Sequence, residues 1–158
     1  MPTPPAETGW RQTHLGRLLG LAMRRFDERV LVLMASNVNV PLGLSHLAAR
    51  GQVGAAHIHI TRHLAVEGSR LTDLARAAGM SKQAMGALVD QCEAWGMVTR
   101  AADPADARAR QVRFTATGLA WLGAYRDAVA QAEAEMRQAI GDEVATVLAL
   151  GLEAYSGQ

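Results

Sequence analysis

The sequence has few of the features that would support a disulfide framework, a membrane anchor or a signal peptide. It contains one cysteine, Cys92, in 158 residues, which excludes an intramolecular disulfide and a multi-cysteine zinc site. No apolar run approaches the ~18 residues of a membrane span. Residues 1–11 lack the basic and apolar parts of a signal peptide. We therefore expect a soluble cytoplasmic protein that makes no membrane contact.

The common catalytic and cofactor-binding motifs are also missing. The sequence contains no GxGxxG, GxSxG, HExxH or P-loop pattern, so we expect no enzyme activity, no catalytic residue and no cofactor. His59 and His63 stand one helical turn apart, as metal ligands can, with His57 close by. No third ligand stands at an obvious spacing, so we expect surface or interface histidines and no metal site.

Composition and charge distribution are more informative. Aromatic residues make up 4% of the chain and hydrophobic residues 49%, enough to fill the core of one domain. The net charge is only +1, but residues 62–113 hold eight basic and six acidic residues, whereas residues 114–158 hold two basic and six acidic ones. A polyanion such as a phosphate backbone would bind the positive part in preference to the acidic part.

Helical periodicity dominates the first third of the chain. Apolar residues recur at three- and four-residue steps and predict one long helix from Trp10 to about Ser36. Its segment Val30–Ala35 is apolar on every face, which we interpret as part of a dimer interface. A turn-rich linker follows, with a short helical piece at Leu44–Arg50. A second long pattern predicts a helix over Ala55–Val66.

The central segment has the signals of two capped helices joined by a tight turn. Thr72 is placed to cap a helix over residues 73–78, Gly79 can supply a positive φ, and Ser81 is placed to cap a helix over residues 82–95. This arrangement is a helix-turn-helix. The face of the second helix that carries Met85, Leu88, Val89 and Cys92 is expected in the core, with Cys92 as a buried hydrophobe rather than a redox sensor.

The period then changes to that of strands. Met97–Arg100 and Gln111–Thr115 read as paired strands, joined by a ten-residue connection, Ala101–Arg110, that we interpret as a projecting functional loop. Residues 117–140 and an apolar stripe over residues 144–155 predict two final helices. The expected fold class is therefore mostly α with a small β-hairpin wing.

Three segments in this order and spacing resemble the MarR family of winged helix-turn-helix transcription regulators. They are the helix-turn-helix Leu71–Asp90, the wing Asp103–Arg110 and the segment Phe114–Gly118. The resemblance extends from about Leu15 to Leu152. It implies a single domain over residues 1–158, with a winged helix-turn-helix at 55–115 and dimerisation helices at 10–36 and 117–156.

The resemblance also implies the function. A homodimeric repressor would bind a pseudo-palindromic operator in double-stranded DNA, with each recognition helix in a major groove and each wing at a minor groove. A small aromatic or drug-like effector would release it. The alternative is a winged-helix dimer with degenerate DNA contacts, which acts as a ligand- or protein-binding module. Gly86, Ala87 and Ala107 favour that alternative, because they lack the polar side chains that many relatives place there.

The expected DNA-binding residues lie on the recognition helix and the wing, namely Ser81, Lys82, Gln83, Gly86, Ala87, Asp106, Arg108 and Arg110. Gln83 is suited to an adenine edge, and Lys82 to guanine or phosphate. Arg108 would enter the minor groove, and Asp106 would brace either the loop or the guanidinium. Arg110 is expected either to contact the DNA backbone or to lie on protein surface that plays no part in binding.

An effector site is expected where the helical and DNA-binding parts meet. We expect His14, Phe26 and His57 to line a weakly polar cleft there. This assignment depends mainly on the resemblance, together with the expected position of the cleft.

Overall fold

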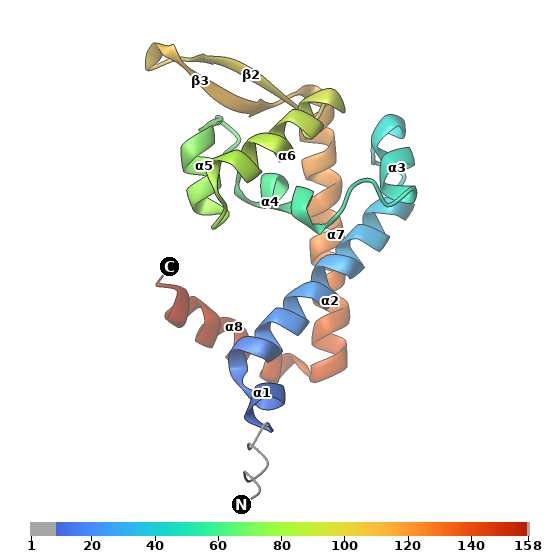
Figure 1. Ribbon diagram of the computed structural model, residues 1–158. Coiled ribbons are helices and arrows are strands. Elements are labelled where there is room, and N and C mark those ends of the chain that lie inside the picture. The colour runs from blue at the N-terminus through green and yellow to red at the C-terminus, as the bar shows by residue number, and fades with distance from the viewer. Residues whose placement is uncertain (1–8, 158) are drawn as a thin grey trace, which may run out of the picture.

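The computed structural model describes residues 9–157 (Figure 1). Residues 1–8 and 158, the two ends of the single domain expected over 1–158, lie outside the described residues, as does the side chain of Ala49. The helices are α1 (Trp10–Thr13), α2 (Leu15–Ser36), α3 (Leu42–Ala49), α4 (Ala55–His63), α5 (Leu71–Ala77), α6 (Lys82–Ala94), α7 (Ala116–Ile140) and α8 (Asp142–Ser156). The strands are β1 (Ser69–Arg70), β2 (Val98–Asp103) and β3 (Asp106–Phe114).

The three strands form one antiparallel sheet in the order β1-β3-β2. β2 and β3 extend beyond the helices as a long hairpin (Figure 1). The ten-residue loop expected between the strands is therefore wrong, because the strand pairing continues to Asp103 and Asp106 and leaves Pro104 and Ala105 at the turn. The sequence pattern also gave no sign of β1, which pairs with β3 through Ser69 and Arg70.

The helix boundaries follow the turn residues closely. Gly79 has a φ of +63° between α5 and α6, as the helix-turn-helix pattern requires. The Ser81 Oγ accepts a hydrogen bond of 3.1 Å from the Ala84 N–H, which confirms the predicted cap of α6. Thr72 is not a cap, because α5 already begins at Leu71.

Two predicted helices are shorter than expected. The long helix over Trp10–Ser36 is interrupted at His14, which has extended backbone and accepts a hydrogen bond of 3.2 Å from the Arg17 N–H. The helix predicted to reach Val66 ends at His63, because Leu64 is extended. Because His14 caps α2 through its side chain, its own backbone is not helical, and α1 ends before it.

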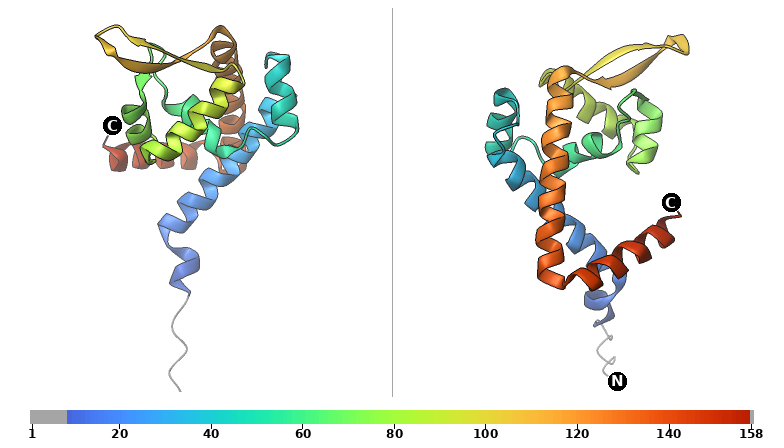
Figure 2. Two further views of the ribbon diagram at one scale, coloured as in Figure 1. Left: turned by 45° about the horizontal axis from the view of Figure 1, so that its top comes forward. Right: turned by 180° about the vertical axis from the view of Figure 1, so that it is seen from behind.

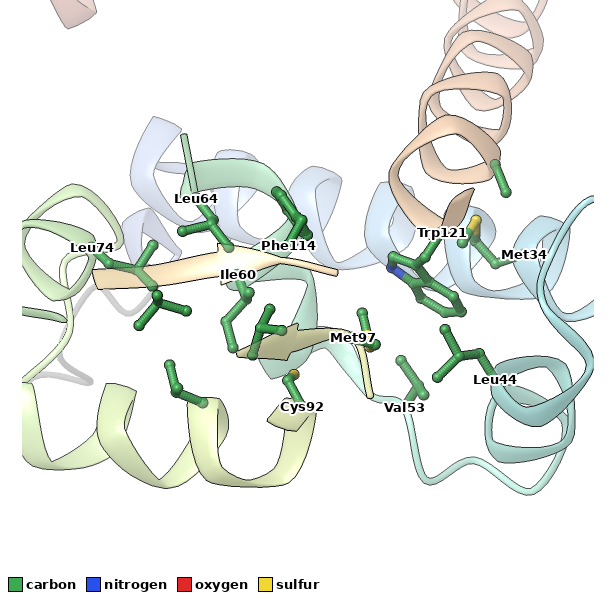
Figure 3. Packing of buried hydrophobic residues seen from close by; sticks show 14 of the residues in the cluster. Met34, Leu44, Val53, Ile60, Leu64, Leu74, Cys92, Met97, Phe114 and Trp121 are labelled. Atoms are coloured by element: carbon green, nitrogen blue, oxygen red, sulfur yellow. The ribbon is translucent and has the colours of Figure 1, made fainter. Parts of the chain in front are cut away.

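The core joins the winged helix to the upper half of the long helices. Figure 3 shows Met34 and Leu44 beside the Trp121 ring of α7, and Ile60, Leu64 and Leu74 grouped near Met97 and Phe114. The Trp121 Nε1–H donates a hydrogen bond of 3.1 Å to the buried Thr61 hydroxyl, so the indole is satisfied within the core. This packing fixes α4 against α7.

The segment Val30–Ala35 lies mainly in this core. Val30 and Met34 are each 1% exposed within the single chain. Val30 and Met34 are therefore covered by the chain's own helices, and the interpretation of this segment as part of a dimer interface stays a prediction for its exposed residues. Val32, at 56% exposed, and Ala35, which is also exposed, are the members of this segment that a second molecule could cover.

The opposite part of the molecule leaves apolar side chains uncovered. We call α1, residues 15–25 of α2 and all of α8 the helical end; α8 runs outward from the lower end of α7 (Figure 2). Its exposed large hydrophobic residues are Trp10, Leu15, Leu18, Leu19, Leu21, Met23, Val144, Val147, Leu148, Leu150, Leu152 and Tyr155. Over the described residues, no helix is both long and apolar enough to cross a membrane.

Candidate nucleic-acid interface

The core residues of α6 determine which of its faces points outward. Met85, Val89 and Cys92 are completely buried, and they hold the helix against the centre of the winged helix. Lys82 and Gln83 stand in the first turn of α6, and both are exposed, with Gln83 on the side opposite these core residues. Ser81 is also exposed, and its hydroxyl oxygen accepts the capping hydrogen bond from the Ala84 N–H. The predicted recognition residues therefore lie together on solvent-facing surface.

Gly86 and Ala87 continue this face with almost no side chain. A Cβ added to Gly86 would meet the Leu71 Cδ2 at 3.8 Å, an ordinary van der Waals contact. Packing therefore does not require glycine at this position. The pair leaves a flat strip beside Gln83, along which another backbone can approach α6 closely.

A buried carboxylate organises the tip of the wing. Asp103 is 5% exposed, and its Oδ1 accepts a hydrogen bond of 2.9 Å from the Ala105 N–H. Its Oδ2 accepts a second, of 2.7 Å, from the Arg70 Nε of β1. The Ala105 N–H and then the Arg70 guanidinium hold the pKa of Asp103 below its usual value. Sequence reasoning missed Arg70, although the turn sequence beginning at Asp103 pointed to a fixed tip.

Asp106 braces the backbone of the wing rather than the guanidinium of Arg108. Its Oδ1 accepts a hydrogen bond of 3.0 Å from the Arg108 N–H. The side chains of Arg108 and Arg110 are exposed on β3. The braced turn thus holds two cationic side chains at the far end of a projecting hairpin, as Figure 2 shows for the hairpin itself.

Most acidic side chains of the winged helix form ion pairs with its arginines. Asp73 pairs with Arg76, and Asp103 pairs with Arg70. By contrast, Lys82, Arg108 and Arg110 form no ion pair with any residue in the range 9–157. The cations left over are therefore those at the first turn of α6 and on the wing, where they add to a local positive potential.

Arg100 connects the two cationic elements. Its Nη2 donates to the Asp90 Oδ1 at 2.6 Å, and its backbone N–H donates to the Glu93 Oε1 at 3.1 Å. Because Asp90 and Glu93 belong to α6 and Arg100 to β2, the contacts fix the angle between recognition helix and wing. Sequence reasoning assigned Arg100 no role, since nothing local indicates that these three residues meet.

The three residues expected to share an effector cleft lie in three separate places. His14 is exposed at the junction of α1 and α2, where it lines a depression of about 550 Å³ with Trp10. Phe26 lines a separate groove of about 690 Å³ between α2, α7 and α8. His57 is 8% exposed and is hydrogen-bonded within the winged helix, away from both.

The remaining candidate residues are His59, His63 and Cys92, and the buried Nδ1 of His59 has no hydrogen-bond partner among residues 9–157. The rings of His59 and His63 stack with centroids 6.1 Å apart, and nowhere in residues 9–157 do three possible metal ligands gather. Burial raises the pKa of the Cys92 thiol to about 12. Since the thiolate is the reactive form of cysteine, such a thiol is poorly suited to redox sensing.

Comparisons with known proteins agree with this geometry. A family model described as MarR family matches residues 52–109. Among solved structures, the transcriptional repressor CouR bound to a 23-mer DNA duplex superposes with a TM-score of 0.68 at 22% identity, covering 98% of this chain and 99% of CouR. The apo form of MarR from E. coli superposes with a TM-score of 0.66 at 20% identity, covering 90% of this chain and 97% of MarR.

A further similar structure is CouR from Rhodococcus jostii RHA1 bound to p-coumaroyl-CoA, with a TM-score of 0.61, 19% identity, and coverage of 90% of this chain and 94% of that one. No curated protein matches the chain. At these identities the structural likeness establishes the fold. Residues 52–109 thus match the model of the MarR family, and the chain as a whole shares its fold with these solved structures.

Proposed function

We propose that this chain is a sequence-specific, double-stranded DNA-binding repressor of transcription that acts in the cytoplasm as a homodimer, and that it is not an enzyme. The observation that carries the proposal is the placement of unpaired cations. Lys82, Arg108 and Arg110 remain without an ion-pair partner in the described range, while Asp73 and Asp103 of the same region are paired. Such a surface attracts phosphates, which supply the sequence-independent part of DNA affinity.

The two cationic elements would read different grooves. α6 enters the major groove with its first turn, where Gln83 bonds an adenine edge and Lys82 bonds guanine or phosphate. The Ser81 end of the helix and the flat strip at Gly86 and Ala87 allow the close approach that this docking requires. The hairpin carries Arg108 into the adjacent minor groove, and Arg110 contacts the backbone beside it.

A second copy of the chain would cover the helical end. Two-fold pairing would bring the exposed hydrophobic residues of α2 against those of α8, such as Leu18 against Val147. The charges favour the same pairing. α1 and residues 15–25 of α2 carry Arg11, Arg17, Arg24 and Arg25, whereas α8 carries Asp142, Glu143 and Glu153. The dimer would present two recognition helices to half-sites about 34–36 Å apart.

The groove at Phe26 is where we place a small aromatic or drug-like effector. Leu21, Phe26 and Met136 give it apolar walls, and Arg25 stands at its rim. A known relative in fold, CouR, has been solved with p-coumaroyl-CoA bound, which contains an aromatic acyl group. An effector that prefers a dimer with the wrong helix spacing lowers DNA affinity, and DNA lowers effector affinity by the same factor.

Selection of bound sequences from random duplex DNA tests the proposal. We expect a pseudo-palindromic consensus whose affinity falls steeply with added salt. Inserting about five base pairs between the half-sites turns one of them to the far side of the duplex and should abolish tight binding. Failure to enrich any sequence, together with equal affinity for all duplexes, would favour a ligand- or protein-binding module instead.

A further inference from the structure

His57 stands at the contact between α4 and the recognition helix. Its Nδ1 accepts a hydrogen bond of 3.0 Å from the Gly54 N–H, and its Nε2 lies 2.7 Å from the Gln91 Oε1 of α6. Its ring also packs on Trp95, the residue after α6, with ring centroids 4.7 Å apart. His57 is 8% exposed, so its ring is shielded from solvent, whereas its partner Gln91 lies at the surface of α6.

The contacts determine the tautomer of the ring. A backbone N–H can only donate, so Nδ1 must be the unprotonated acceptor toward Gly54. The neutral ring then carries its proton on Nε2 and donates it to the Gln91 Oε1. Each nitrogen of His57 therefore has one defined role, with Nδ1 accepting from Gly54 and Nε2 donating to Gln91.

The other end of α4 is fixed to the long helices. The Thr61 hydroxyl accepts the hydrogen bond from Trp121 of α7. The Arg62 Nη2 donates to the Asp27 Oδ1 of α2 at 2.6 Å, and Asp27 is buried. α4 is thus attached to α2 and α7 at one end and to the recognition helix through His57 at the other.

We propose that His57 is a positioning residue for DNA recognition, which sets the orientation of α6 through Gln91. The proposal rests on the DNA-binding function proposed above. Gln91 lies eight residues from Gln83, about 12 Å along the helix axis. A small rotation of α6 about its buried centre therefore moves the Gln83 amide away from a base edge. The long, flexible side chains that contact phosphates can follow such a movement, whereas a bidentate base contact cannot.

The variant Gln91→Ala tests this most directly. It removes the acceptor on α6 but leaves the Gly54 cap and the buried ring in place, and because Gln91 is exposed the fold should remain intact. We expect operator affinity to fall roughly three- to tenfold, as for the loss of one hydrogen bond, with affinity for random duplex unchanged. Gln138→Ala, an exposed glutamine on α7, is the matched control and should leave both affinities unchanged.

A conservative replacement separates positioning from mere stability. His57→Gln can accept from the Gly54 N–H, as glutamine does at this position of a capping box, and its amide can still donate toward Gln91. His57→Leu can do neither. We expect the operator-to-random ratio of His57→Gln to lie closer to that of the parent than the ratio of His57→Leu, with both compared at equal folded fraction.

Ring nitrogen-15 chemical shifts provide a readout that does not depend on DNA. The parent chain should show His57 protonated on Nε2, and Gln91→Ala should keep this tautomer while losing discrimination. Protonation on Nδ1 instead would overturn the assigned geometry. If the parent discriminates operator from random DNA and Gln91→Ala does so equally well, the positioning role alone fails. If the parent does not discriminate at all, the proposed function fails and takes the positioning role with it.

Discussion

The two ends of this molecule differ in how much apolar surface and how much unpaired charge they expose to solvent. The winged-helix end, residues 55–115, buries most of its large apolar residues in the chain's own core and exposes unpaired cations such as Lys82 and Arg108. The helical end differs in its apolar surface: α8 buries only Ala145 and leaves Val147, at 70% exposed, uncovered. One end therefore has a complete core and an incomplete charge balance, and the other has an incomplete core. The winged-helix end is therefore suited to bind a polyanion, and the helical end is suited to pack against another apolar surface.

A charge introduced by substitution at the helical end should have the largest effect on dimerisation and operator affinity. Val147→Asp would bury a carboxylate in the proposed dimer interface, twice by symmetry, at a cost of about 3 kcal/mol or more per copy. We expect a monomer in sedimentation at micromolar concentration and a loss of operator affinity on the order of 100-fold. Val38→Asp is the matched control, since Val38 is 94% exposed in the linker outside the helical end. A Val147→Asp variant that still sediments as a dimer would contradict the proposed interface.

The junction between the winged-helix end and α7 should be most sensitive to substitution at Gly118, in the first turn of α7. A Cβ on this residue would stand 1.9 Å from the carbonyl oxygen of Met97, which is fixed at the base of the wing. Gly118→Ala should therefore lower the free energy of unfolding by about 3 kcal/mol or more. Gly123, in the same helix, has no heavy atom within 4 Å of its added Cβ. Gly123→Ala should instead raise stability, by up to about 1 kcal/mol, and denaturant unfolding of both variants measures the contrast.

The sequence predicted the winged-helix end better than the helical end because its signals there are local. Gly79 and Ser81 fix the turn and the cap between α5 and α6 by their own conformational preferences, whatever packs around them. The break at His14 depends on a weak local bond, and histidine is not among the strong capping residues. No pattern around it distinguishes a kink from a continuous helix.

The extent of the wing could not be predicted for a different reason. The residues that continue the ladder include Ala101 and Ala102, and alanine has low intrinsic preference for strands. The ladder is held by contacts that are distant in sequence, such as Arg70 with Asp103. Similarly, Val30 and Met34 look suited to an interface until α7 is seen to cover them. Periodicity identifies an apolar face but does not identify its partner.

Gln83→Ala should produce the next largest effect, confined to the winged-helix end. Loss of one base-edge contact costs about 1–3 kcal/mol on the preferred operator and relaxes discrimination at one position in each half-site. Selection of bound sequences with the variant measures the change. Oligomeric state should be unaffected, since Gln83 lies far from α8. A consensus identical to that of the parent at every position would show that Gln83 does not read bases.

Arg108→Ala should weaken binding less and in a different manner. Its guanidinium is proposed to occupy the minor groove, so we expect a loss of about 1 kcal/mol, a salt slope reduced by about 1, and a weaker preference for A·T-rich flanks. The major-groove consensus should stay the same. Arg126→Ala is the control, because Arg126 is an exposed arginine on α7 that pairs with Asp127. An unchanged salt slope in Arg108→Ala would make the wing a passive hairpin.

The smallest predicted effect concerns an ion pair between the two long helices. The Arg29 Nε donates to the Glu135 Oε2 at 2.6 Å, and its Nη2 donates to the Oε1 at 2.8 Å. Arg29, and after it Gln131, lower the pKa of Glu135 from 4.5 to about 2. A carboxyl group whose pKa is lowered by folding stabilises the protein above its ordinary pKa, and this contribution is lost as the pH falls from 4.5 toward 2.

Glu135→Gln should therefore melt at a lower temperature than the parent near pH 7, and the difference should shrink below pH 4.5 and vanish near pH 2. Since both side chains are partly exposed, added salt should also reduce the difference at pH 7. Scanning calorimetry of the two proteins across this pH range gives the comparison. A difference that stays constant down to pH 2.5 would mean that Glu135 stabilises the α2–α7 contact by packing and not by its charge.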